Sequence, residues 1–278
     1  ARLNNLHLKI LFYLQKSSEV FSGTDIKGGV VVTLFDKSRV LGPIGATTSF
    51  EELNSITDKV ENSLNFKSII SIIETQNKFN LDELFKDYPQ YKGIIGSEGR
   101  DKRLRQVIME RLDIFTENSS GNDDYLICGR IQGKRVYRFI PKKYIEDNKV
   151  INKYKVFVPA ANGTGALGEK LSTPLIGEPL VGITQTFISF GSFETQVEAE
   201  AMLKYIKTKF ARTLLGVLKI TQGNNRETWA KVPLQDFTEN SDIDWLKSIS
   251  EIDMQLYKKY GLSKEEIAFI EEKVQPMD

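Results

Sequence analysis

Residues 153–179 read Lys153-Tyr-Lys-Val-Phe-Val-Pro159-Ala-Ala-Asn162-Gly163-Thr-Gly165-Ala-Leu-Gly168-Glu-Lys-Leu-Ser-Thr-Pro174-Leu-Ile-Gly177-Glu-Pro179. Val156 and Val158 alternate with Lys155 and Phe157, which predicts a β-strand that ends at the first proline. The remainder holds four glycines and two further prolines, which predicts a long loop. We expect the other elements to be arranged around this strand and the loop over residues 160–174, called the glycine loop below.

The segment Gly163-Thr-Gly165-Ala-Leu-Gly168 has the spacing of a dinucleotide- or S-adenosylmethionine-binding turn. That site needs a helix that begins at the glycines and an acid about 20 residues further on. Pro174, Gly177 and Pro179 prevent a helix, and residues 181–190 contain no Asp or Glu. Two interpretations stay open: an ordered surface loop, or a loop that lays backbone N–H groups and small side chains against a partner's phosphates or base edges.

The composition, with 40% hydrophobic and 27% charged residues among 278, is ordinary for a soluble globular protein. No apolar run reaches 18 residues, so no membrane contact is expected, and a single cysteine, Cys128, is compatible with a cytoplasmic location. One histidine, His7, cannot build a Cys/His metal site or a Ser/His/Asp set with the residues at hand. We therefore assign no catalytic residue and no metal ligand, and we expect structural roles for His7 and Cys128.

Charge is unevenly distributed along the chain. Residues 130–155 hold nine Lys and Arg side chains against two acids, interleaved with aromatic residues. This pattern is typical of a surface that follows nucleic-acid phosphates. The residues predicted to contact phosphates are Arg130, Lys134, Arg135, Arg138, Lys142, Lys143 and Lys155. Residues 236–278 are acidic and are expected to face away from nucleic acid.

A second loop, residues 221–226, is rich in side chains that read base edges in the DNA major groove: Asn and Gln pair with adenine, and Arg pairs with guanine. We call it the polar loop. Together with the glycine loop it supplies the predicted base-reading residues, which are Asn162, Thr164, Gln222, Asn224, Asn225 and Arg226.

The remaining pattern predicts a mixed α/β (α+β) fold. Strands are expected at 6–14, 30–35, 66–74 and 181–190, with a further strand ending at 45–48 and a hairpin over 125–130 and 135–140. Helices are expected at 50–64, with Ser49 as N-cap and Glu52 in its capping box, and at 100–115, 194–220, 243–260 and 264–274.

Several segments, in this order, resemble one family. They are Thr24-Asp-Ile-Lys-Gly-Gly-Val30, residues 154–165, Ser172-Thr-Pro-Leu-Ile-Gly-Glu-Pro179, Tyr205-Ile-Lys-Thr-Lys-Phe210, Val232-Pro-Leu-Gln-Asp-Phe237 and residues 256–271. The chain is similar to the C-terminal halves of bacterial Type II and combined restriction–modification, adenine-specific DNA methyltransferases. Val232-Pro-Leu also resembles the end of the recognition repeats in Type I specificity subunits.

The resemblance implies a division into three parts. Residues 1–65 would be the C-terminal remnant of a methyltransferase catalytic domain, at the edge of its sheet. Residues 66–235 would be a mixed-sheet target-recognition domain that binds double-stranded DNA, and residues 236–278 a helical tail. The family's cofactor motif and Asn/Asp-Pro-Pro-Tyr/Phe motif are missing, as expected if they lie upstream.

This chain is therefore expected to hold no cofactor and to be inactive alone, while the parent protein binds S-adenosylmethionine through its upstream methyltransferase domain. The implied mechanism is base flipping, with residues 24–29 near the flipped adenine. Two alternatives remain: a specificity subunit that docks on a separate catalytic chain through its acidic tail, and a small-molecule enzyme that uses the glycine loop.

Overall fold

The computed structural model describes residues 5–14, 17–23, 29–42, 44, 47–96, 101–121 and 123–278. Its centre is a four-stranded antiparallel sheet in the order β3 (Ile73–Glu74), β9 (Phe187–Phe193), β6 (Tyr154–Pro159), β7 (Leu175–Gly177). The predicted strand before the glycine loop is thus confirmed as β6. Its residues 155–159 are buried, so both faces of this strand are covered.

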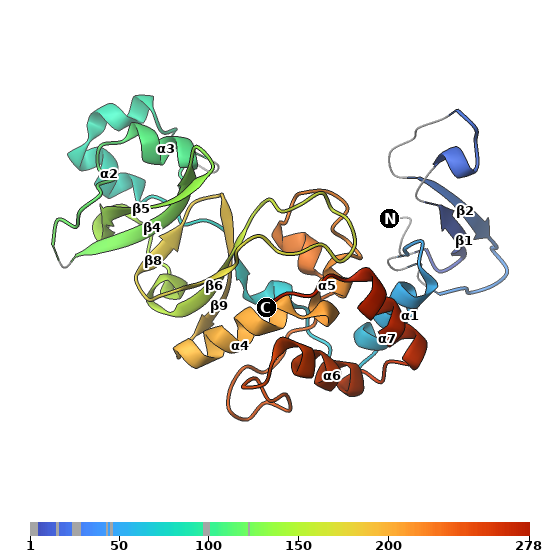
Figure 1. Ribbon diagram of the computed structural model, residues 1–278. Coiled ribbons are helices and arrows are strands. Elements are labelled where there is room, and N and C mark those ends of the chain that lie inside the picture. Colours follow the sequence, from blue (N-terminus) through green and yellow to red (C-terminus); the bar gives the residue numbers. More distant parts are fainter. Residues whose placement is uncertain are drawn as a thin grey trace.

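A second sheet lies beside the first, in the order β5 (Lys134–Pro141), β4 (Asp124–Ile131), β8 (Val181–Ile183) (Figure 1). The predicted hairpin is confirmed, and its turn has positive φ at both Gln132 (49°) and Gly133 (77°), as a two-residue type I′ turn requires. Helices α2 (Leu81–Asp87) and α3 (Gln106–Arg111) pack against this sheet around a core that contains Phe79, Ile127 and Ile140.

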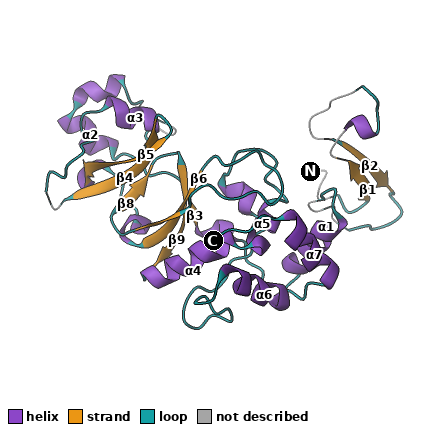
Figure 2. Ribbon diagram, viewed as in Figure 1, coloured by secondary structure: helices purple, strands orange, loops and turns teal. Residues whose placement is uncertain are grey.

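Most helices gather on the other side of the central sheet (Figure 2). They are α1 (Glu51–Glu61), α4 (Gln196–Lys207), α5 (Lys209–Leu215), α6 (Ile249–Lys259) and α7 (Lys264–Lys273). Single 3-10 turns occupy Ser17–Glu19, Ile69–Ile72, Pro89–Gly93, Lys142–Tyr144, Lys149–Asn152 and Arg226–Trp229. One core joins α1, α4–α7 and the central sheet, so the mixed α/β class is confirmed.

Two of the predicted long elements are interrupted where side chains bond to the backbone. The helix expected at 194–220 is divided at Thr208, whose Oγ1 donates to the Tyr205 carbonyl and accepts from Ala211 N. The strand expected at 181–190 is divided at Thr184–Thr186, where the chain leaves one sheet and enters the other. Residues 181–183 pair with β4 and residues 187–193 pair with β6, so partners distant in the sequence decide where this strand is interrupted.

Other sequence-based expectations are wrong in extent. The first helix starts after Phe50, and its N-cap forms no side-chain hydrogen bond. Thr48, and not the predicted Ser49, bonds to the start of the helix: its hydroxyl accepts from Phe50 N and donates to Asn54 Oδ1. Only the end of 66–74 is a strand, since Ser68 caps a 3-10 turn. Of 100–115, only 106–111 is helical. The backbone at 102–104 bonds instead to residues 77–79, and residue 100 lies outside the described residues.

The tail helices end and begin where the sequence predicts. Gly261 has φ +60° after α6, and Ser263 forms a capping box with Glu266 at the start of α7. The first tail helix is shorter than predicted, because α6 begins at Ile249, where Ser248 caps it, rather than at 243. Among the described residues, no helix is long and apolar enough to cross a membrane.

Strands β1 (Leu8–Leu14) and β2 (Val30–Phe35) form a separate antiparallel pair, the β1–β2 ribbon, at one end of the molecule (Figure 1). Both strands were predicted. Leu11, Phe12 and Phe35 are each about half exposed on it. The predicted end of a third strand at 45–48 falls partly outside the described residues, as do residues 24–28 of the first family-like segment.

Candidate nucleic-acid interface

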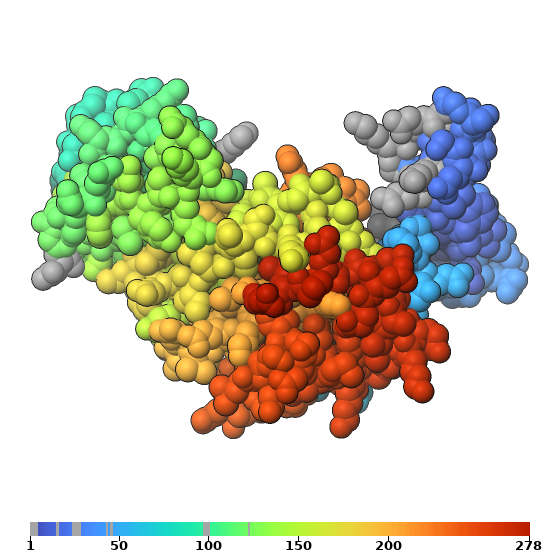
Figure 3. Space-filling view, viewed as in Figure 1, coloured from blue at the N-terminus to red at the C-terminus, as the bar shows by residue number. Residues whose placement is uncertain are grey.

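A hollow lies between two projecting parts of the molecule (Figure 3). One wall is the lobe built from α2, α3, β4 and β5, and the other includes the β1–β2 ribbon. The glycine loop and the polar loop meet at its floor, coloured yellow and orange in Figure 3. Helix α6 lies on the side away from the hollow (Figure 1), whereas the end of the tail contacts the glycine loop, since Gln275 N donates to the Gly168 carbonyl at 3.1 Å.

The two loops are bonded to each other through their backbones. Asn162 N donates to the Gln222 carbonyl and Asn224 N to the Ala160 carbonyl, each at 2.8 Å. Ala161 and Gly223 face each other in an isolated antiparallel bridge. The floor of the hollow is therefore one short β-like contact between loops that lie about 60 residues apart in the sequence.

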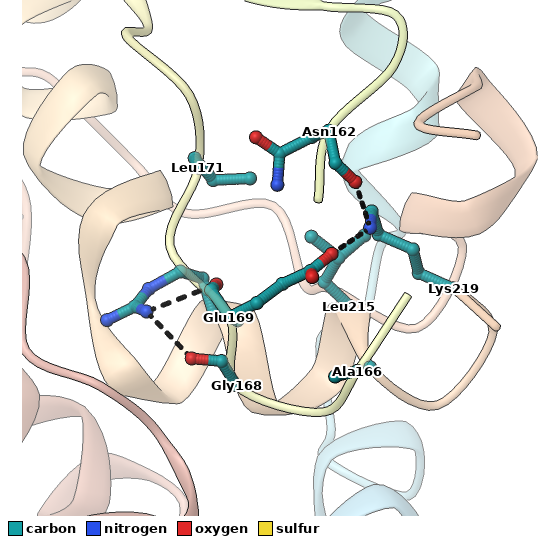
Figure 4. Close-up of a pocket in the computed structure, with 9 residues that line it drawn as sticks. Asn162, Ala166, Gly168, Glu169, Leu171, Leu215 and Lys219 are labelled. Carbon is teal, nitrogen blue, oxygen red and sulfur yellow. Dashed lines mark hydrogen bonds and ion pairs between the residues drawn. The ribbon is translucent and has the colours of Figure 1, made fainter. Parts of the chain in front are cut away.

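The glycine loop folds around its own acid, Glu169 (Figure 4). The Glu169 carboxylate accepts from Thr164 N at 2.8 Å and Gly165 N at 3.1 Å, and it pairs with the Lys219 ammonium. Burial alone would raise the pKa of Glu169, but the hydrogen bonds from Lys219, Thr164 and Gly165 outweigh it and hold that pKa below its ordinary value. These N–H groups already face an anion, so they are not available to an external phosphate.

Arg212 holds the other end of the same loop. It is buried in α5, and its Nη1 donates to the carbonyls of Gly168 and Glu169 at 3.3 and 3.4 Å (Figure 4). The pocket between these groups has a volume of about 10 Å³, which is room for one water molecule and not for a cofactor. The nucleotide-site interpretation of the G-x-G-x-x-G spacing thus finds no cavity here.

Three of the predicted DNA contacts are buried and act within the fold. Lys155 is 1% exposed, and its ammonium donates to the carbonyls of Ile151, Lys153 and Glu178 at 2.8–2.9 Å. The Asn162 side chain bonds to Lys170 O and Ser172 N inside the glycine loop. Asn224 accepts from the indole of Trp229 and donates to Pro159 O. We correct these three assignments, because each side chain is buried and hydrogen-bonded within the fold.

The other four predicted base-reading residues are exposed, although most have a local hydrogen bond. Thr164 bonds to Glu169, Asn225 caps the turn at Arg226–Trp229, and the Arg226 Nε donates to Ile70 O at 2.9 Å. The Gln222 side chain is exposed and has no partner within the described residues. Gln222 is therefore the freest of the four to contact a ligand on the floor.

The six predicted phosphate contacts other than Lys155 divide into two groups. Arg138, Lys142 and Lys143 are paired with Glu117, Asp123 and Asp87 respectively. Arg130 and Arg135, by contrast, are direct cross-strand neighbours, here called the arginine pair, and neither has a carboxylate partner in the described part of the chain. Lys134 follows the hairpin turn and is exposed without an ion pair among those same residues.

The arginine pair is tied to the floor of the hollow. Arg135 Nη2 donates to Thr173 O at 2.9 Å and lies over the ring of Phe187. Thr173 has φ +39°, an unusual conformation for a β-branched residue, which the arginine contact helps to hold. Strand alternation places Arg138 on the opposite face of β5.

Gln185 is a polar residue near the floor of the hollow that the sequence analysis did not predict as a DNA contact. The residue is exposed in the turn between β8 and β9, and its Oε1 accepts from Gln106 N at the start of α3 at 2.8 Å. The same turn bonds to the glycine loop through Ala160 N and Thr186 O. The Thr-Gln-Thr sequence at 184–186 was the available signal, since it interrupts an otherwise apolar strand with residues that favour turns.

No group of three or more His, Cys, Asp or Glu side chains that could hold a metal ion occurs in the described residues. The ring Nδ1 of His7 lies 2.8 Å from the Arg39 carbonyl. Cys128 is buried, and burial raises the pKa of its thiol to about 11. Both residues hold local structure, as expected.

No family model matches the chain. No curated protein matches it either. Among solved structures, the chain is similar to the type IIG restriction endonuclease BpuSI, with a TM-score of 0.39 and 13% sequence identity over 92% of this chain. The similarity covers 36% of the BpuSI chain, so this chain spans about a third of that protein's length.

Proposed function

We propose that the chain is the sequence-specific double-stranded-DNA recognition part of a restriction–modification enzyme in the cytoplasm. In this proposal, a further catalytic domain of the parent protein uses S-adenosylmethionine to methylate N6 of adenine. The chain itself holds no cofactor. The order of family-like segments supports the enzyme class, and the chemistry of the hollow supports DNA as the ligand.

The arginine pair is the observation that carries the proposal. Like charges directly opposite each other on neighbouring strands destabilise a sheet. Arg130 and Arg135 occupy such positions next to a polar floor, and no carboxylate of the described residues pairs with either of them. A surface that keeps two uncompensated guanidinium groups together is suited to a phosphate backbone, which arginine binds with paired hydrogen bonds.

The floor supplies the groups for base reading. Gln222, Asn225, Arg226 and Gln185 are exposed there or beside it, and amide and guanidinium groups pair with adenine and guanine edges in the major groove. In this division of labour the arginine pair fixes the register on the duplex, and the floor reads the sequence.

The test is binding to a randomised duplex pool at two salt concentrations, followed by sequencing of the retained DNA. We expect an enriched motif and an affinity that falls steeply with salt. Arg135→Gln should weaken binding to all sequences and reduce the salt slope by about one ion. Arg138→Gln makes the same change in charge on the same strand but removes an arginine already paired with Glu117, so it is the matched control.

An unchanged salt slope in Arg135→Gln would show that the arginine pair does not contact DNA. Absence of salt-dependent binding by the wild-type chain would contradict the proposal as a whole. A thermal shift on adding S-adenosylmethionine or NAD without DNA would instead favour the small-molecule enzyme.

The β1–β2 ribbon supports a second interaction, with a protein. A two-stranded sheet is at best marginally stable alone, and Leu11, Phe12 and Phe35 leave apolar surface open on this one. We propose that the ribbon packs against the methyltransferase domain. The alternative, a specificity subunit that docks on a separate catalytic chain, predicts a stable complex with that chain in gel filtration. That alternative docks through the acidic tail, so its complex should survive the double change of Phe12 and Phe35 to Lys, whereas packing of the ribbon on the methyltransferase domain should be lost.

A further inference from the structure

We propose that Lys219 and Glu169 form a clamp that fixes the glycine loop and the polar loop in one mutual register, and that sequence discrimination depends on it. The inference rests on the proposed function, since it takes both loops to face DNA. Lys219 and Glu169 are positioning residues in this scheme and do not themselves touch DNA.

Lys219 joins the two loops at one atom. Its Nζ donates to Asn162 O at 2.9 Å and Thr221 O at 3.2 Å, and it pairs with the Glu169 carboxylate (Figure 4). The side chain is 4% exposed. All three ammonium protons therefore have acceptors, two in the glycine loop and one in the polar loop.

Glu169 connects Lys219 to the exposed part of the glycine loop around Thr164. Its carboxylate binds the backbone N–H groups of Thr164 and Gly165 as well as Lys219. Besides the Ala161–Gly223 bridge, the glycine loop approaches this segment closely at Gly165, where a Cβ would collide with the backbone of Ile220 and Thr221. A displacement of Glu169 would consequently move Thr164 relative to Gln222, which follows Thr221 directly.

The energetic character of the pair favours a positioning role. A buried ion pair adds little net stability compared with apolar groups of similar size, because both charges lose their hydration. It does favour one geometry strongly, since any other arrangement leaves a buried charge unpaired. Base reading needs such preorganisation, because hydrogen bonds to base edges fail when donors shift by about an ångström.

The test compares Lys219→Met with Lys155→Met. Both changes remove a buried ammonium bonded to backbone carbonyls, but Lys155 lies outside the two loops. Dissociation constants are measured for the enriched duplex and for duplexes with one base pair changed, at two salt concentrations. Thermal unfolding is recorded for each variant.

We expect Lys219→Met to reduce the discrimination between these duplexes by about tenfold, the size of one lost base contact, while the salt slope stays unchanged. Lys155→Met should retain discrimination at a similarly lowered melting temperature. Glu169→Gln keeps one acceptor oxygen and should lose discrimination only in part, and it carries the test if Lys219→Met does not fold.

Full discrimination in Lys219→Met, or in Glu169→Gln when the lysine variant does not fold, would overturn the clamp. Equal loss in Lys155→Met would overturn it too, because general destabilisation would then explain the effect. A wild-type chain that binds DNA without any sequence preference would also overturn it, while leaving DNA binding intact. Failure of the wild type to bind DNA at all would be a failure of the proposed function.

Discussion

At the scale of single residues, Lys155 links burial to pH. Burial lowers the pKa of its ammonium to about 7, whereas the unfolded chain keeps the ordinary value near 10.5. Between these values the unfolded state binds more protons than the folded state, so stability increases with pH. The free energy of unfolding should rise by up to about 1.4 kcal/mol per pH unit in the wild type relative to Lys155→Met. Urea unfolding at pH 6.5, 8 and 9.5 measures this, and parallel pH curves for the two proteins would contradict it.

Residue types were predictable from the sequence, but burial was not. Asn224 and Lys155 have the chemistry of DNA-contacting residues, and a single sequence gives no sign that they are enclosed. Buried Asn224 bonds to Pro159, 65 residues away, and buried Lys155 bonds to the Glu178 carbonyl, 23 residues away. Arg135 shows the opposite case, since its exposure follows from a local hairpin that the sequence does specify.

At the scale of elements, Thr208 separates α4 from α5. Its hydroxyl accepts from Ala211 N as the N-cap of α5 and donates to Tyr205 O at the end of α4, and the residue is fully buried. Thr208→Ala should therefore lower the free energy of unfolding by about 1–2 kcal/mol. Thr208→Ser keeps the hydroxyl and should recover most of that loss in urea unfolding. Equal destabilisation by both changes would mean that the methyl group, and not the cap, matters.

Elements with local signals were the ones predicted well. The capping box at Ser263 and the glycine at 261 define the α6–α7 corner from neighbouring residues alone. The strands at 66–74 and 181–190 were predicted too long, because their pairing partners decide where they end. Residue 69 bonds to Val232, and β8 joins β4 rather than continuing into β9. Strand length depends on contacts that one sequence does not reveal.

At the scale of the whole molecule, the floor and the two walls of the hollow differ in how firmly buried contacts hold them to the rest of the fold. The floor is held by Arg212 on α5 and by Lys219, which follows α5 and pairs with Glu169 of the glycine loop. The hairpin wall has its own core. The β1–β2 ribbon contributes no residue to any of the three buried clusters found in the described chain. Ligand-induced movement, if it occurs, is therefore expected at the ribbon before the floor.

The same contrast gives a prediction for truncation. Removing residues 1–47 should leave the midpoint of urea unfolding nearly unchanged and should decrease binding of an apolar dye, because exposed Leu11, Phe12 and Phe35 are lost. Removing residues 264–278 deletes buried Phe269, Ile270 and Val274 together with the Glu266–Lys59 pair. At about 2 kcal/mol for each apolar side chain, this loss is comparable to the whole stability of a domain, so that variant should unfold. If the first truncation also unfolded the chain, the ribbon would be part of the folding unit, and a catalytic domain could not be its main support.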